Sequence, residues 1–96
     1  MAEGFAVPKG SQIKYLQRRL DELQKLEESF KSEVNFELAH KMGHQIKGNA
    51  STFNLQSLES FGLRLEKAAQ RKDSAAVREE LIGLTGIVAD LLKELI

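Results

Sequence analysis

The 96-residue chain contains no cysteine, no tryptophan and a single proline, Pro8. Without cysteine there is no disulfide framework, no thiolate zinc site and no cysteine nucleophile. This absence is compatible with the cytoplasm, where we expect the protein to act. From Ser11 onward proline is absent and glycine is sparse, so nothing in that long stretch forbids helix.

An excess of one charge is also missing, as is any long apolar run. The 14 Lys and Arg residues balance 14 Asp and Glu residues, which gives no basic footprint for nucleic acid and no polybasic membrane anchor. No apolar stretch approaches the roughly 20 residues of a membrane span. The opening MAEGFAVPKG lacks the basic start and apolar stretch of a signal peptide. We therefore expect no membrane insertion, and a single domain of residues 1–96 in which residues 1–10 form an irregular lead-in.

The sequence does have apolar residues at helical spacing, in four blocks. The first block contains Ile13, Leu16, Leu20, Leu23, Leu26 and Phe30, and the second contains Phe36, Ala39, Met42, Ile46, Ala50 and Phe53. The third contains Leu55, Leu58, Phe61, Leu65 and Ala68, and the fourth contains Val77, Leu81, Leu84, Val88, Leu91 and Leu95. Short connections force neighbouring helices to run antiparallel. The predicted fold class is therefore all-α, an antiparallel up-down four-helix bundle after a short lead-in, and its closed core favours a monomer.

Residues that suit helix ends lie between the blocks. Ser32 or Asn35 can cap the second helix, and Asp73 or Ser74 can cap the fourth. Asn54 can either cap the third helix or take a left-handed conformation that ends the second.

His44 faces away from the apolar stripe of its own block. At about 100° per residue, it lies roughly 140° from the centre of the stripe, and should point toward solvent. Gly48, one turn later, leaves the imidazole uncovered, because helical side chains lean toward the N-terminus. A glycine inside a helix costs about 1 kcal/mol relative to alanine, and Gly43 repeats that cost. Lys47 and Lys41, each three residues from His44, can bring positive charge to the same face.

An exposed imidazole with this setting suits temporary storage of a phosphoryl group. The ordinary pKa of imidazole, about 6.5, leaves a large neutral fraction with a free lone pair at neutral pH. The phosphoramidate that forms is high in energy and transfers readily. On geometry alone, a surface histidine beside a loosely packed glycine is an equally good interpretation.

The stretch from His44 to Ala69, HQIKGNASTFNLQSLESFGLRLEKAA, resembles the histidine-containing phosphotransfer (HPt) domains of bacterial multistep phosphorelays. Their hallmark is a phosphorylated histidine followed three residues later by lysine and four later by glycine, which here are His44, Lys47 and Gly48. The similarity continues through Phe53, Leu58, Gly62, Leu65, Glu66 and Ala69, and upstream through Tyr15, Leu16 and Arg19. Asn54 departs from the pattern, since many members have glycine there, but asparagine also tolerates a left-handed backbone.

The resemblance implies that His44 is phosphorylated at its outer ring nitrogen, receives the group from an aspartate of a receiver domain and passes it to another receiver. The partner, a response-regulator receiver domain or a hybrid sensor histidine kinase, would supply the aspartate, the Mg²⁺ and most of the catalysis. The chain would then need no cofactor of its own. It has no nucleotide-binding glycine loop, so we expect a phosphocarrier without autokinase activity.

The partner should cover the face around His44. Folding the hairpin about Asn54 brings residue 64 opposite residue 44 and Glu66 within one turn. Glu66 could orient the imidazole by accepting a hydrogen bond from its inner nitrogen, although we favour a solvated or structural glutamate. Besides Lys47 and Gly48, the expected docking face comprises His40, Lys41, Gly43, Ser51, Ser57 and Arg64.

Three other functions compete with phosphotransfer. His40 and His44, one turn apart, could chelate a metal, but a third ligand at clear spacing and cysteine are both lacking. Haem binding through Met42 is weaker still, because Met42 lies on the core stripe and His44 faces away. The serious alternative is an adaptor bundle that binds a receiver or a histidine kinase with its histidine unused.

Overall fold

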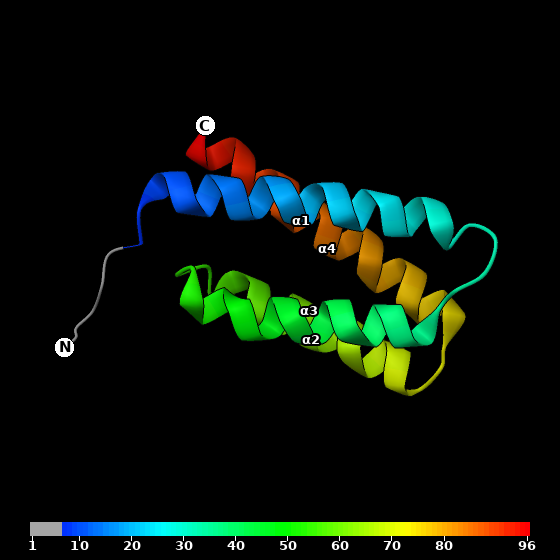
Figure 1. Ribbon diagram of the computed structural model, residues 1–96. Helices are drawn as coiled ribbons and strands as arrows, with labels where there is room; N and C mark the ends of the chain where they lie inside the picture. The colour runs from blue at the N-terminus through cyan, green and yellow to red at the C-terminus, as the bar shows by residue number, and fades with distance from the viewer. Residues whose placement is uncertain (1–6) are drawn as a thin grey trace.

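The computed structural model describes residues 7–96 and contains four helices, α1 (Lys9–Ser29), α2 (Phe36–Thr52), α3 (Ser57–Gln70) and α4 (Ser74–Leu95). Successive helices run in opposite directions (Figure 1), which confirms the antiparallel up-down bundle. The first helix begins at Lys9 and not after residue 10, because the Pro8 carbonyl accepts the N–H groups of Ser11 and Gln12. Residues 1–6 of the predicted lead-in lie outside the described residues.

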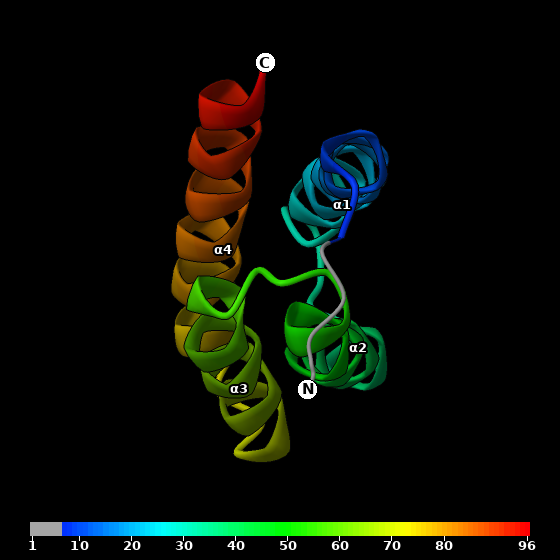
Figure 2. The ribbon, with the colours of Figure 1, turned by 90° about the vertical axis from the view of Figure 1, so that its left-hand side faces the viewer.

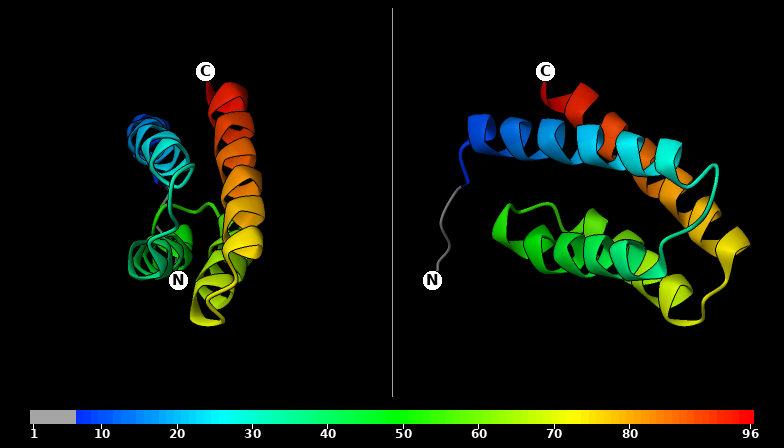
Figure 3. Two further views of the ribbon diagram at one scale, coloured as in Figure 1. Left: turned by 90° about the vertical axis from the view of Figure 1, so that its right-hand side faces the viewer. Right: turned by 45° about the vertical axis from the view of Figure 1, so that its right-hand side comes forward.

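The helices stand in two layers, with α1 and α4 in one layer and α2 and α3 in the other (Figure 2). Viewed along the bundle, α1 stands over α2 and α4 stands over α3 (Figure 2). The closest packing is between α2 and α3, and α4 packs against both α1 and α3. Figure 3 shows α4 running obliquely from the end of α3 to the N-terminal half of α1. No helix in residues 7–96 is long and apolar enough to cross a membrane.

Two of the predicted caps are in place. Asn35 Oδ1 accepts the backbone N–H of Leu38 at the start of α2, and Asp73 Oδ1 accepts that of Ala76 at the start of α4, each at 3.0 Å. These bonds satisfy N–H groups that have no partner inside the helix. Asn35 and Asp73 therefore prevail over the alternatives Ser32 and Ser74.

The α2–α3 turn uses the left-handed backbone that the sequence offered as one possibility. Asn54 has φ 57°, while the cap position of α3 is Gln56, whose side chain makes no capping bond. Asparagine is one of the few residues other than glycine that adopts this region readily. The turn before α4 contains a second left-handed residue, Lys72 at φ 55°, which the sequence did not indicate.

The core consists of the predicted apolar stripes. The residues that are almost completely buried include Leu16, Leu23, Phe30, Ala39, Ile46, Ala50, Leu58, Leu65, Ala68, Val77, Leu81, Leu84 and Val88. Stripe residues near the ends and edges of the helices, such as Met42 and Phe53, are partly buried. Tyr15 was not part of the predicted stripe, yet it is buried and stacks on Phe53 with ring centroids 4.2 Å apart.

The helices α2 and α3 cross where two glycines meet. A Cβ atom on Gly43 would lie 2.6 Å from the backbone nitrogen of Glu66, and one on Gly62 would lie 2.7 Å from that of Lys47. These positions cannot hold a side chain unless the backbones separate. Gly43 is buried in this crossing, so its prediction as a partner-binding residue is wrong. The conformational cost of glycine in the helix is offset here by the close approach of two backbones.

Another side of α2 meets α1 through side chains. No Cα atoms of the two helices come within 8 Å of one another. The space, which we call the α1–α2 seam, is bridged by Tyr15, Arg19, Met42 and Asn49. Asn49 Oδ1 accepts from Arg19 Nη2 at 2.9 Å and from Tyr15 Oη at 3.3 Å. Arg19 Nη1 donates to Met42 Sδ at 3.8 Å, and to Glu22 of its own helix at 2.6 Å.

Candidate functional site around His44

His44 lies in the middle of α2 with 65% of its side chain exposed, so its predicted outward orientation is confirmed. The ring is not free, because its Nδ1 atom lies 2.9 Å from Glu66 Oε2 on α3. An ionised carboxylate can only accept, so Nδ1 carries the hydrogen and donates it. In the neutral ring, Nε2 then holds the lone pair. The contact therefore fixes both the orientation and the tautomer of an exposed imidazole.

Glu66 is buried, with 8% of its side chain exposed, and both carboxylate oxygens are used. Oε1 accepts from Lys47 Nζ at 2.7 Å, and Oε2 accepts from His44. The bond from Lys47 holds the pKa of Glu66 below its usual value, and the bond from His44 acts in the same direction, while burial opposes both. The expectation of a solvated glutamate is wrong, since Glu66 is buried and contacts the His44 ring, while a part for Glu66 in the reaction stays a prediction.

Lys47 stands at the edge of the buried surface, with 31% of its side chain exposed. The sequence predicted that its ammonium would stand beside a group on His44. The structure places the ammonium on Glu66 Oε1, so its direct effect is to balance the charge of the buried carboxylate. Lys47, Glu66 and His44 thus form one connected set in which the carboxylate lies between two donors.

The space around His44 is open toward the C-terminal end of α2. Gly48 is exposed, and a Cβ atom built there would meet nothing within 4 Å. Ser51, one turn further, and Lys41, on the other side of His44, are exposed as well. A partner can therefore reach the ring without displacing a side chain at position 48.

The model of the Hpt domain family matches residues 13–96. The chain belongs to the Hpt domain family. No curated protein and no solved structure matches it. Members of this family are phosphocarrier domains of phosphorelays and interact with receiver domains and kinases. The matched part of this Hpt domain contains most of α1 and the whole of α2, α3 and α4.

The third-helix part of the predicted docking face lies elsewhere in this Hpt domain. Arg64 Nε donates to Glu80 on α4 at 3.0 Å, and its guanidinium stacks over the ring of Phe61 at 4.6 Å. Arg64 and Glu66 are two positions apart, which puts them on nearly opposite sides of α3. Ser57, two turns before Arg64, shares its side. Arg64 and Ser57 therefore do not lie beside His44, contrary to the prediction.

Sequence reasoning missed Gln70, which reaches the site from the last turn of α3. Its Nε2 atom lies 3.3 Å from His40 Nε2. Gln70 is four residues after Glu66 and so lies on the same side of the helix, which is the signal that could have identified it. His40 itself is 41% exposed and borders Glu66, as its place on the predicted face requires.

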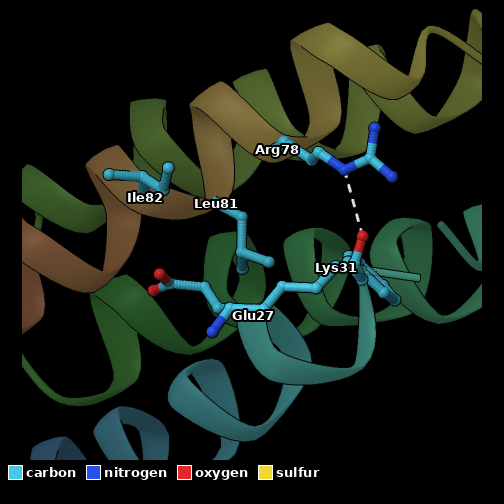
Figure 4. Close-up of a pocket in the computed structure, with 6 residues that line it drawn as sticks. Glu27, Lys31, Arg78, Leu81 and Ile82 are labelled. Atoms are coloured by element: carbon cyan, nitrogen blue, oxygen red, sulfur yellow. Dashed lines mark hydrogen bonds between the residues drawn. The ribbon is translucent and has the colours of Figure 1, made fainter. Parts of the chain in front are cut away.

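Of the hollows on residues 7–96, two bear on the location of the site. One, of about 200 Å³, opens in the α1–α2 seam next to the His44 face and is lined by Leu26, Leu38, Lys41, Met42 and Gln45. The other, of about 150 Å³, lies between the end of α1 and α4 and is lined by Glu27, Phe30, Lys31, Arg78, Leu81 and Ile82 (Figure 4). There Arg78 Nε donates to the Phe30 carbonyl at 3.0 Å. Only the first hollow borders the candidate site.

The geometry also bears on the competing ligand sites. Met42 turns into the α1–α2 seam toward Arg19, whereas His44 turns toward Glu66, so the two do not converge on one iron. Within residues 7–96, no group of three or more His, Cys, Asp or Glu side chains is arranged to hold a metal ion.

Proposed function

We propose that this Hpt domain is a phosphorelay intermediate that accepts a phosphoryl group on His44 from a receiver-domain aspartate and passes it to another receiver. The observation that carries the proposal is the 2.9 Å bond from His44 Nδ1 to buried Glu66, on a ring that is 65% exposed. Such a ring presents an unprotonated Nε2 in a fixed direction. A surface histidine without function has no need of a buried carboxylate partner.

The proposed reaction requires only this nitrogen from the chain. The Nε2 lone pair attacks the phosphorus of the aspartyl phosphate, the Nε2–P bond forms, and the P–O bond to aspartate breaks with its electron pair returning to the carboxylate. The hydrogen stays on Nδ1, so positive charge develops on the ring beside Glu66. Ionised Glu66 stabilises that charge. The reverse sequence of events delivers the group to a second receiver.

Lys47 supports the same step through Glu66. A carboxylate that is buried without a partner tends to take up a proton. The 2.7 Å bond from Lys47 keeps Glu66 ionised and therefore able to accept from His44 Nδ1. The Mg²⁺ and the aspartate belong to the receiver in this proposal, and we expect no cofactor and no autokinase activity in this chain.

The receiver would dock on the exposed side of α2. His40, Lys41, Gly48 and Ser51 surround His44 there, and the hollow in the α1–α2 seam continues this face at Lys41. A mostly polar face of this kind beside a hollow suits a small, transient interface. We propose that the domain acts in the cytoplasm as a monomer, since each copy contains a complete site.

The test is transfer from a phosphorylated receiver to the purified chain. We expect acid-labile phosphate on the wild type and on His40→Gln, and none on His44→Gln. Label on His44→Gln together with its loss from His40→Gln would mean that His40 is the acceptor. A chain that binds the receiver but takes up no phosphate would instead be the adaptor, the second candidate function.

A further inference from the structure

A third basic side chain, His40, lies beside the Glu66 carboxylate without a hydrogen bond to it. His40 Nε2 is 3.6 Å from Glu66 Oε2, the same oxygen that accepts from His44 Nδ1 at 2.9 Å. The two rings are one turn apart on α2, within 4° of parallel, with centroids 6.3 Å apart. The proposed phosphotransfer reaction gives His40 no role.

Gln70 faces His40 in an arrangement that suits one form of its ring. Its Nε2 atom lies 3.3 Å from His40 Nε2, and because an amide nitrogen only donates, the ring nitrogen facing it must hold a lone pair. This contact suits a neutral His40 with its hydrogen on Nδ1. In this form it offers Glu66 Oε2 no hydrogen, and the oxygen is left to His44.

A proton on His40 reverses this arrangement. Nε2 becomes a charged donor that faces Oε2, and a small rotation shortens the contact to the roughly 2.8 Å of a charge-assisted bond. The Gln70 amide then sets a donor against a donor and has to turn to present its oxygen. Imidazole ordinarily takes up its proton close to neutral pH. The groups facing His40 are Glu66 and Gln70 from α3 and His44 from its own helix, with exposed Glu37 one turn earlier.

We infer that His40 is a positioning residue that, once protonated, competes with His44 for Glu66 Oε2 and makes the orientation of the reactive ring depend on pH. The basis is that Glu66 Oε2 has two imidazole neighbours, His44 Nδ1 at 2.9 Å and His40 Nε2 at 3.6 Å. The consequence for phosphotransfer rests on the proposed function: when His40 is protonated, the carrier holds its ring less firmly. The competition itself is a property of the unphosphorylated chain.

A pH titration of the full chain by NMR tests the competition directly, with isotopic label in the histidine rings and glutamine amides. In the wild type, the His44 Nδ1 and Gln70 amide signals should shift at the pH where His40 takes up its proton. The hydrogen-bonded Nδ1–H signal of His44 should weaken in the same step. In His40→Gln this step should be lost, while the titration of His44 itself remains.

Two matched variants sharpen the result. Lys41→Gln removes an exposed positive charge next to His40 and should leave the step in place. Glu66→Gln removes the shared carboxylate, so the protonation of His40 should no longer reach the His44 signal. A His44 titration that is superimposable in the wild type and His40→Gln would overturn the inference. Because no phosphate is involved, a chain that shows the step but takes up no label would refute only the proposed function.

Discussion

The two sides of α2 are built in different ways. Toward α3, the helix makes backbone contact through Gly43 and Gly62, at distances that leave no room for a Cβ atom. Toward α1, it keeps its backbone apart and relies on long side chains such as Arg19. Small residues give a contact that cannot adjust, whereas long side chains can rearrange and leave a hollow. The rigid side holds Glu66 against His44, and the adjustable side borders the face where a partner would dock.

The largest effect should come from Gly43→Val, which breaks the rigid side. The branched side chain meets the backbone of Glu66 and Gly62, and overpacking of this kind costs about 3 kcal/mol in the free energy of unfolding. Urea denaturation measures the loss. The control is Gly83→Ala on α4, where a Cβ meets nothing within 4 Å, and a gain of up to about 1 kcal/mol is expected. Equal stability of the wild type and Gly43→Val would show that the crossing can yield.

Glu66→Gln should come next, because it keeps the shape of the rigid side but removes the charge that it positions. An amide presents a neutral acceptor, or a donor, to His44 Nδ1, so the tautomer is held less firmly. Losing the charged part of such a bond predicts a roughly tenfold slower transfer from a phosphorylated receiver. Glu59→Gln, an exposed change on the same helix, is the control. An unchanged rate in a folded variant would remove Glu66 from the mechanism.

Asn49→Ala tests the adjustable side and should have a smaller effect. It removes the shared acceptor of Arg19 and Tyr15, which lowers the free energy of unfolding by about 1 kcal/mol. The transfer rate should stay within about twofold of the wild type, because Asn49 does not contact the His44–Glu66 pair. A rate loss as large as that of Glu66→Gln would contradict the division between the two sides.

The smallest effect is the acid dependence of stability that Glu66 confers. Its pKa is lowered in the folded chain, so its contribution is complete above the usual value of 4.5 and is lost as the pH falls through the folded value. The difference in unfolding free energy between the wild type and Glu66→Gln should therefore shrink below about pH 4.5. Urea denaturation of both proteins at several pH values measures it. If the difference in unfolding free energy grew as the pH fell, the pKa of Glu66 would have to be raised in the folded chain.

The repeating parts of this fold could be predicted from the sequence. The stripe from Val77 to Val88 and the outward phase of His44 follow from helical periodicity alone, because each concerns one helix. The meeting of Gly43 with Gly62 joins two helices whose relative offset no periodicity specifies. The same offset decides that Glu66, and not Arg64, faces His44. Folding the hairpin about Asn54 placed both residues near the site. Only the rotation of α3 about its own axis decides which of the two side chains faces His44.

The position of His44 along α2 has a further consequence. It stands about two turns from either end, at Phe36 and Thr52, and the field of the helix dipole is concentrated in the first and last turns. A phosphoryl group on His44 would therefore lack the backbone N–H cradle that fixes phosphates at helix N-termini. Held by one nitrogen and little else, it would leave as readily as it arrives. The direction of flow through such a carrier would be decided by which of its partners is the more heavily phosphorylated.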